Sequence, residues 1–590
     1  MLDATDYELI TTPDVVRRAA ADLAKHSVLG FDTETTSLDP YAGRLRLVQF
    51  SSPSGVYVFD MDCFGDDLAR CDALAPLREL LSALRPVKIA HNAKFDAKWI
   101  KKTLDVEIGG LFDTLLASQL ISAGEQEDRH GLAAVASRYL GESVDKSERL
   151  SDWSGELTSS QLEYAARDAS VLLPLRERMV ERLKADALNM VAQLEFECVQ
   201  PVADMELAGF FLDQHRWREQ LVSVEHQRIK LADQLQEMLA EGAIQGSLFG
   251  RAEINLDSQV QVSEALKRLG VPLPESTRNW KLQPLAADYP VVATLLEYRT
   301  VQKAMTSYGE NILEEISPVT GRVHADFRQI GAPTGRFSCS NPNIQQVPHA
   351  VEYRRCFRAP EGRKLIIADY SQIELRILAD FSGDKGFIEA FRSGADLHRV
   401  TAAQVFGVGL EQVSTDQRSF AKRLNFGVVY GIGAQRFAML TGMSQTEAEN
   451  VLRRYFATYP QLDQFLRDVA NRAVRERSVR TASGRLVKFN FDPADKQAVS
   501  GAQRNGKNAP IQGTSADILK RALRLLHDRL RGTGARIVNI VHDEVVVESD
   551  APNAEEIVKL VDEALTAAGE EYVSAVPVKV EVEVADEWVK

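Results

Sequence analysis

Residues 364–376 read KLIIADYSQIELR, and the apolar run at their start is typical of a buried β-strand that ends at Asp369. A second stretch, ARIVNIVHDEVVVES, places His542, Asp543 and Glu544 between two β-branched segments. This pattern predicts a β-hairpin with acids at its bend. A single acid at a strand end is merely solvated in most proteins, so the interpretation depends on what surrounds these two strands.

A helix is predicted between the two strands. Ser414 and Gln417 form the S-x-x-Q pattern of a capping box, which opens a helix. Two cations and then two aromatic residues recur every fourth residue behind it, on one broad helix face: Arg418, Lys422, Phe426 and Tyr430. Such a face suits a triphosphate with its base stacked beyond. Alone, a basic and aromatic face more often covers the protein core.

Two more segments carry polar side chains suited to nucleic acid. PTGRFSCSNPNIQQVP contributes Arg336, and RNGKNAPIQGTSAD contributes Arg504, Asn508 and Gln512 to a helix face. Asn and Gln amides can donate to minor-groove acceptors that all base pairs share. Sequence-independent contact of this kind is what a copying enzyme needs.

The N-terminal part carries a second cluster of acids, within short apolar runs that alternate with helical segments in an α/β pattern. Asp32 and Glu34 lie two residues apart after the run SVLGF, so both project from one strand face. Asp96 follows the strand-like VKIAHN, and Tyr164 and Asp168 are spaced i,i+4 on one helix face. Carboxylates that share a small volume repel each other unless cations bind, which favours a pair of divalent ions. A lone D-x-E is usually a solvated pair, but the ordered set is much more specific.

This ordered set resembles the three motifs of the proofreading exonuclease family that ends in Tyr-x-x-x-Asp, which bacterial DNA polymerase I and ribonuclease D share. The resemblance implies that Asp32, Glu34, Asp96 and Asp168 hold two Mg²⁺ ions and that Tyr164 helps to orient the attacking water. The segment VDKSERLSDWS looks closer to ribonuclease D. The N-terminal part alone therefore does not decide whether the substrate is DNA or RNA.

The chain from residue 28 to the C-terminus resembles the family A DNA polymerases, the bacterial DNA polymerase I type. DYSQIELR, QRSFAKRLNFGVVYG and VHDE match the motifs A, B and C of that family. The resemblance implies a ribonuclease H-like α/β exonuclease domain followed by an α+β right-hand polymerase with palm, fingers and thumb. The implied division is 1–185 exonuclease, 186–310 thumb and connection to the palm, 311–380 first palm part with motif A, 381–503 fingers with motif B, and 504–590 second palm part with motif C.

The same resemblance implies a metal site and a nucleotide site. Asp369 and Asp543 would carry two Mg²⁺ ions, with Mn²⁺ able to substitute, and Glu544 would lie adjacent. The triphosphate of an incoming dNTP would be held by the side chains of Arg418, Lys422 and His398. Lys422 would also act as the general acid that protonates the leaving pyrophosphate.

Further residues would select the sugar and hold DNA. Phe426 would stack beside the sugar, and Tyr430 would close the site against the templating pair. Glu374, paired with Tyr430, would fill the space of a ribose 2′-OH and so favour deoxyribonucleotides. The primer-template would be tracked by Arg336, Arg504, Asn508, Gln512 and His542.

Composition is compatible with this function. The chain has 590 residues, 45% of them hydrophobic, and a net charge of -14, which is ordinary for a soluble multidomain protein. Residues 451–510 nevertheless carry 12 basic and 5 acidic side chains, so a local basic surface is available for a polyanion. Five cysteines without a C-x-x-C pair indicate neither zinc nor disulfides.

No signal peptide and no membrane-spanning run is expected. We expect a monomer in the cytoplasm, associated with the nucleoid, or a phage- or plasmid-encoded protein that acts in the host cytoplasm.

Two features depart from the family pattern. The chain opens directly on the proofreading domain, without the usual flap nuclease, so we expect another protein to remove primers. In addition, Gln245, Leu248 and Phe249 resemble the Q-x-x-L-F peptide that binds bacterial sliding clamps; a hydrophobic loop packed on the thumb is the alternative.

The sequence thus predicts a DNA-directed DNA polymerase, in replication or repair, with an active 3′–5′ exonuclease. A catalytically silent DNA-binding scaffold and a 3′ exonuclease without polymerase activity remain the alternatives. The presence of every acid of both metal sites counts against the scaffold, and Glu374 disfavours RNA synthesis.

Overall fold

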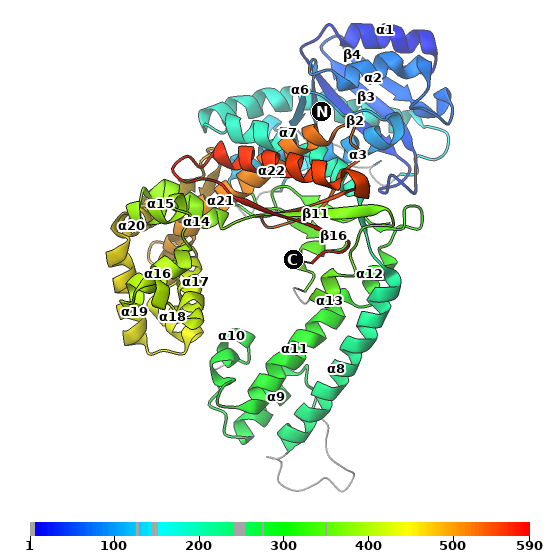
Figure 1. The fold of residues 1–590 in the computed structure, drawn as a ribbon. Helices are drawn as coiled ribbons and strands as arrows, with labels where there is room; N and C mark the ends of the chain where they lie inside the picture. The colour runs from blue at the N-terminus through cyan, green and yellow to red at the C-terminus, as the bar shows by residue number, and fades with distance from the viewer. Residues whose placement is uncertain are drawn as a thin grey trace.

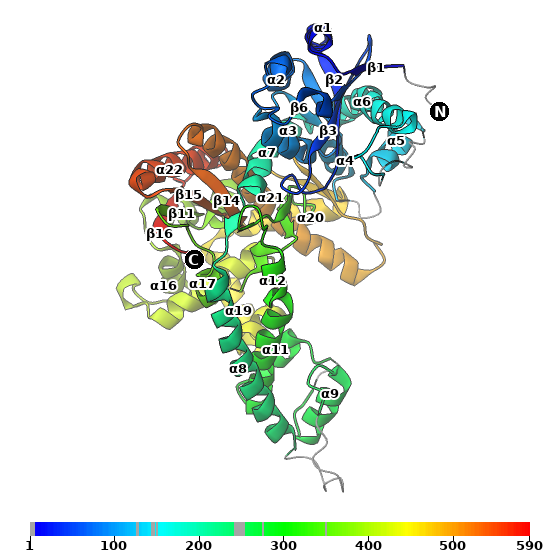
Figure 2. The same cartoon turned by 90° about the vertical axis from the view of Figure 1, so that its right-hand side faces the viewer.

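The computed structural model describes residues 6–124, 129–142, 148, 151–240, 254–273, 276–348 and 351–589, with Val351 described by its backbone alone. An N-terminal α/β body lies at one end, a pair of long helices projects from the other, and a helical body stands beside a second sheet (Figures 1 and 2). Within the described ranges, no helix is both long and apolar enough to cross a bilayer.

The N-terminal body is built on a mixed six-stranded sheet of order β1-β4-β3-β2-β5-β6. Central strand β2 pairs antiparallel with β3 and parallel with β5. The strands are β1 (Tyr7–Ile10), β2 (Val28–Thr35), β3 (Leu45–Ser52), β4 (Gly55–Asp60), β5 (Val87–Ala90) and β6 (Leu111–Asp113).

Helices cover both faces of this sheet (Figure 2). One face packs against α1 (Pro13–Leu23), α2 (Ala75–Ser82) and α3 (Ala93–Leu104). The other packs against α4 (Thr114–Ser122), α5 (Leu132–Leu140) and α6 (Ser159–Ala185). At Gly30 on β2, a Cβ atom would lie 2.1 Å from the Ala169 carbonyl oxygen of α6, so only glycine allows this close approach.

Helix α7 (Asn189–Ala208) leads from this body to the projecting helices α8 (Gln214–Ala240) and α11 (Pro290–Tyr308). The buried face of α8 includes Trp217, Leu221 and Leu235, which recur at helical spacing. Helix α9 (Gln259–Arg268) lies between α8 and α11 in the chain and is capped by Ser258. The short helices α10 (Asn279–Leu282), α12 (Asn311–Glu314) and α13 (Val351–Arg354) complete this region.

The second sheet is antiparallel and has the order β14-β15-β11-β16. Its strands are β11 (Arg363–Tyr370), β14 (Arg536–Val541), β15 (Glu544–Asp550) and β16 (Val580–Ala585), and α21 (Lys496–Leu530) and α22 (Ala554–Glu570) pack beside them. The predicted hairpin with acids at its bend is confirmed, since β14 and β15 are joined by His542 and Asp543. Three two-stranded ribbons lie nearby: β7 (Phe210–Phe211) with β8 (Arg322–Val323), β9 (Asp326–Arg328) with β10 (Ser338–Ser340), and β12 (Ser478–Arg480) with β13 (Leu486–Lys488).

A helical body is inserted between β11 and α21 (Figure 1). It contains α14 (Ile373–Ser382), α15 (Lys385–Arg392), α16 (Leu397–Phe406), α17 (Thr415–Val429), α18 (Ala434–Thr441), α19 (Gln445–Thr458) and α20 (Pro460–Arg475). The capping box predicted at Ser414 and Gln417 is present at the start of α17. The insertion therefore sets α17 beside the acids of the second sheet.

Candidate active sites

The acids of the N-terminal body come together from three elements. Asp32 and Glu34 lie on β2, Asp96 is in the first turns of α3, and Tyr164 and Asp168 lie on α6. The Thr33 hydroxyl donates to Asp96 Oδ1 at 2.6 Å, and the Gln49 amide donates to Asp32 Oδ2 at 3.1 Å. The five residues predicted from the motifs are therefore neighbours in space.

The electrostatics of this cluster favour a bound cation. Burial raises the pKa of Asp32 well above its ordinary value, and the charges of Asp96, Glu34 and Asp168 raise it further. Burial likewise raises the pKa of Glu34, with Asp168 and Asp96 as the next causes, and raises that of Asp96 to about 7. Mutual repulsion of buried carboxylates is relieved when a divalent cation binds.

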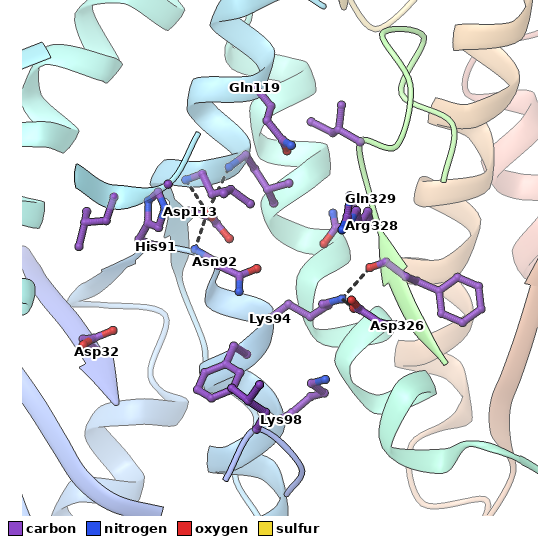
Figure 3. Close-up of a pocket in the computed structure, with 18 of the residues that line it drawn as sticks. Asp32, His91, Asn92, Lys94, Lys98, Asp113, Gln119, Asp326, Arg328 and Gln329 are labelled. Atoms are coloured by element: carbon purple, nitrogen blue, oxygen red, sulfur yellow. Dashed lines mark hydrogen bonds and ion pairs between the residues drawn. The ribbon is translucent and has the colours of Figure 1, made fainter. Parts of the chain in front are cut away.

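The cluster opens into a groove of about 810 Å³ between the N-terminal body and the ribbon β9–β10. Asp32, Tyr164 and Asp168 line it from one side. Figure 3 shows Asp32 on its strand and, across the groove, Lys94 of α3 meeting Asp326 of β9. The Lys94 ammonium donates to Asp326 Oδ1 at 2.6 Å. A strand end could enter this groove.

Asp113 is a buried acid of the same groove that sequence reasoning missed. Its carboxylate accepts the backbone N–H groups of Ala93 and Leu115, both at 2.8 Å, so it fixes the starts of α3 and α4. Burial raises its pKa to about 6. The signal was present, because Asp113 ends a short apolar run, LFD, as Asp32 ends another.

The second pair of acids meets across the register of β11 and β15. Asp369 pairs with Glu544 in that register, and the Tyr370 N–H donates to the Asp543 carbonyl at 3.4 Å. Asp369 and Asp543 therefore lie side by side and line a groove of about 710 Å³. Burial raises the pKa of Asp543 to about 7, and the charge of Asp369 adds to this.

Helices α16 and α17 form the facing wall of this second groove. All the side chains predicted to hold a nucleotide line it: Glu374, His398, Arg418, Lys422, Phe426 and Tyr430. Arg418 Nε donates to Asp396 Oδ2 at 2.6 Å. Asp396 also accepts the N–H groups of His398 and Arg399 at the start of α16, so one carboxylate holds both helices together.

A third contact closes the groove near Glu374. Arg336 donates to Glu374 Oε1 at 2.5 Å. Tyr430 follows the last residue of α17 as its C-cap, and its hydroxyl interacts with both Arg336 and Glu374. Burial, and then the charge of Glu374, raise the pKa of Tyr430, so it faces Glu374 as a neutral phenol.

Some predicted residues lie elsewhere. Glu544 is not among the residues that line the groove; the buried Trp588 donates to Glu544 Oε1 at 2.8 Å. His542 and Arg336 line the groove, whereas Asn508 and Gln512 line an adjoining cavity that shares Ala332 with it. Arg504 is exposed on α21, with its Cγ next to Gly431. The clamp-like residues Gln245, Leu248 and Phe249 lie outside the described residues.

Two separate carboxylate clusters, one of them facing a basic and aromatic helix, define a nucleic-acid enzyme with two reaction centres. Residues 222–590 match the model of DNA polymerase family A, and residues 7–184 match that of a 3′–5′ exonuclease. The chain therefore belongs to DNA polymerase family A and is a template-directed DNA polymerase with 3′–5′ exonuclease activity.

Similar proteins cover nearly all of the chain. DNA polymerase I of Pseudomonas aeruginosa is 32% identical over 99% of this chain and 66% of its own length. DNA polymerase I of Aquifex aeolicus is 32% identical over 99% of this chain and 100% of its own length. The solved POL domain of Pol1 from M. smegmatis, in complex with DNA primer-template and dNTP, has a TM-score of 0.86 at 26% identity and covers 99% of both chains.

These comparisons establish the predicted architecture: the N-terminal body is the exonuclease domain, followed by a right-hand polymerase. The alternatives of a silent scaffold and of an exonuclease alone are not supported. Exonuclease and polymerase domains of these families depend on metal ions.

Proposed function

We propose that Asp369 and Asp543 are the carboxylates at which this chain adds deoxyribonucleotides to a primer 3′-OH. The observation that carries the proposal is the β11–β15 register, which sets the two acids together in the groove that Arg418 and Lys422 also line. A triphosphate held by Arg418 and Lys422 would have its reacting phosphate next to Asp369 and Asp543.

We propose Mg²⁺ as the physiological metal, two ions in each centre, with Mn²⁺ as a substitute. The donor atoms are carboxylate oxygens, which suit Mg²⁺. Burial and the charge of Asp369 raise the pKa of Asp543, and a divalent cation would offset both effects. Bound ions of this kind lower the pKa of the attacking hydroxyl and neutralise charge on the phosphates. Asp369 and Asp543 would hold them, and Asp32, Glu34, Asp96 and Asp168 would do so in the exonuclease. Glu544 follows Asp543 in the chain and accepts a hydrogen bond from Trp588. This contact supports a secondary role for Glu544 beside the metal site.

The fingers would bind the incoming dNTP. Arg418 and Lys422 would hold the triphosphate with His398, and Lys422 would protonate the leaving pyrophosphate. Phe426 lies with its ring centre 5.8 Å from that of His398, which supports a place for Phe426 beside the sugar. Tyr430 and Glu374 would bound the sugar pocket on the other side.

The primer-template would run along α21 and the first palm segment. Arg336 and His542 line the polymerase groove, and Asn508 and Gln512 line the cavity that adjoins it, which supports contacts to DNA at these four positions and at Arg504. In the exonuclease, Tyr164 would orient the attacking water, since burial and Asp168 raise its pKa and keep it a phenol.

We also propose the domain division 1–185, 186–310, 311–380, 381–503 and 504–590, with the second sheet in the palm, α8 and α11 in the thumb, and α15 to α20 in the fingers. The boundaries after 185 and 310 fall between helices, which supports them, whereas those after 380 and 503 fall within α14 and α21. For the protein in the cell we propose a monomer that acts in the cytoplasm in DNA replication or repair. Binding to a sliding clamp stays a hypothesis.

The test is a 5′-labelled primer-template incubated with Mg²⁺, with and without dNTPs. Wild type should extend the primer when dNTPs are present and shorten it when they are absent. Asp543→Ala should lose extension by a factor of roughly a thousand or more, as expected for loss of a metal ligand, and should keep shortening. Extension by Asp543→Ala at the wild-type rate would refute the assignment.

A further inference from the structure

A buried polar network lies behind the nucleotide wall of the fingers. Asn425 of α17 and Thr401 of α16 are fully buried, and His398 is 2% exposed at the edge of the polymerase groove. Asn425 Nδ2 lies 3.0 Å from His398 Nδ1 and 3.1 Å from Thr401 Oγ1. Thr401 Oγ1 in turn lies 3.1 Å from the hydroxyl of Tyr459. The imidazole is thus held from behind by one amide.

The chemistry of an amide decides which imidazole nitrogen carries the proton. An Asn NH₂ group only donates, so a neutral imidazole bonded to it must accept at that nitrogen. His398 Nδ1 is the nitrogen that faces Asn425, and its proton must then reside on Nε2. The ring therefore has an N–H donor on the side away from Asn425.

We propose that Asn425 is a positioning residue that fixes His398 as the Nε2–H tautomer, so that the imidazole donates a hydrogen bond to a triphosphate oxygen. The inference rests on the proposed role of His398 in triphosphate binding. In the other tautomer, an Nε2 lone pair would face the phosphate oxygens and repel them.

The surroundings of His398 keep its imidazole neutral, so its tautomer and not its charge decides whether it can donate to a phosphate oxygen. Burial lowers the pKa of His398 to about 4. The charge of Asp396 acts in the opposite direction, and the charges of Arg418 and Lys422 lower the pKa further. The imidazole is then neutral at the pH of DNA synthesis, and its single N–H group must point the right way.

The network is also rigid. The Tyr459 ring packs edge-on against Phe387, with ring centres 4.6 Å apart, and burial raises its pKa to about 12. A buried amide that lost its partners would be left with unsatisfied polar atoms. Thr401 Oγ1 also lies 3.3 Å from Asn425 Oδ1, so this hydroxyl contacts both ends of the buried Asn425 amide.

The first experiment needs no variant. Nitrogen-15 NMR of the full chain labelled at histidine, with the His398 signals assigned by their loss in His398→Gln, reports which nitrogen carries the proton. We expect protonated Nε2 and unprotonated Nδ1 at pH 8. A His398 signal protonated at Nδ1 would overturn the inference.

The second experiment replaces the donor by an acceptor of the same shape. Asn425→Asp should move the proton to Nδ1 and raise KM for dNTP roughly ten- to a hundredfold, the loss expected for a hydrogen bond to a charged group, with a much smaller change in kcat. The matched control Thr401→Val removes the next hydroxyl of the network but leaves the Asn425 amide, and should keep the wild-type tautomer. Thermal unfolding of each variant, followed by circular dichroism, reports whether the part of the chain around Asn425 is folded.

The outcomes separate the two proposals. If His398→Ala leaves KM for dNTP unchanged, the proposed role of His398 in binding is wrong. If His398→Ala raises KM but Asn425→Asp changes the tautomer without changing KM, His398 binds the nucleotide and the positioning inference fails.

Discussion

At the scale of single residues, the acids of both centres oppose folding when no metal is bound. The pKa of Asp543 is about 7 and that of Asp96 is also about 7, mainly because both are buried. An ordinary aspartate in the unfolded chain has a pKa of about 3.9. The folded protein therefore binds protons at these sites more tightly than the unfolded chain does, and stability falls as pH rises from about 4 to about 7.

This sign gives a prediction for Asp543→Asn. In EDTA at pH 8 the amide removes a buried charge, and we expect the melting temperature to rise by several degrees. Each pH unit between the folded and unfolded pKa values changes the free energy of unfolding by at most about 1.4 kcal/mol. At pH 4 the wild-type acid is already protonated, so the gain should vanish. Thermal unfolding of wild type and Asp543→Asn at both pH values, in EDTA and in excess Mg²⁺, measures this difference. An equal gain at both pH values would contradict the electrostatic explanation.

Glu374 gives a second prediction at this scale. The residue is 8% exposed and its carboxylate is held by Arg336 and Tyr430, so Glu374 is well placed to exclude a 2′-OH group. We expect Glu374→Ala to raise the relative incorporation of ribonucleotides at least tenfold, which corresponds to about 1.4 kcal/mol of lost discrimination. Single-nucleotide incorporation assays with matched rNTP and dNTP measure the ratio.

The control is Glu374→Gln, which keeps the volume and removes the charge. It should keep most of the discrimination if steric exclusion is the cause. Equal discrimination in wild type and Glu374→Ala would refute the steric role.

At the scale of elements, a buried ion network joins α7, the ribbon β12–β13 and α21. Glu195 Oε1 accepts from Lys520 and from Arg485, each at 2.5 Å. Arg485 also donates two hydrogen bonds to Asp517 Oδ1, from Nε at 3.0 Å and from Nη2 at 2.6 Å. Although burial acts to raise it, the pKa of Glu195 is lowered by these cations. Two cations thus balance two anions in the interior.

We therefore predict that Lys520→Met destabilises the protein by about 3–5 kcal/mol, because it leaves one buried carboxylate uncompensated. The matched control is Lys559→Met on α22, where the lysine is exposed and the same substitution should change stability by less than about 0.5 kcal/mol. Urea unfolding midpoints of the two variants compare the effects. A loss of similar size in both would show that the buried network contributes nothing specific.

These elements also show what sequence patterns can and cannot predict. The face of α17 and the Tyr164–Asp168 pair on α6 were predictable, because helical spacing fixes neighbours within a few residues. The ion network was not, since Glu195 and Lys520 lie hundreds of residues apart and neither belongs to a motif. The hydrogen bond that draws Glu544 to Trp588 depends on the C-terminal segment folding back on the palm, which no local pattern encodes.

At the scale of the whole molecule, the two reaction centres stand on separate hydrophobic cores. The exonuclease sheet packs its faces against its own helices, whereas the polymerase acids belong to a core that the second sheet shares with α8, α11 and the helices inserted after β11. The two parts are joined at the groove of Figure 3, where Lys94 of α3 pairs with both Glu206 of α7 and Asp326 of β9, each at 2.6 Å. Among the residues that the structure describes, none lines both reaction grooves.

Separate cores and separate grooves predict separable activities. Asp32→Ala combined with Glu34→Ala removes two carboxylates from the acid cluster of the exonuclease and leaves the second sheet unchanged. We therefore expect 3′ shortening to fall by a factor of roughly a thousand or more while primer extension stays within about twofold. The matched comparison is Asp543→Ala, which should show the reverse on the same labelled primer-template. Mismatched primers sharpen the measurement, because the double variant should extend them without first removing the mismatch. Loss of extension together with shortening in the double variant would mean that the exonuclease acids also maintain the polymerase domain, and that the two centres are not independent.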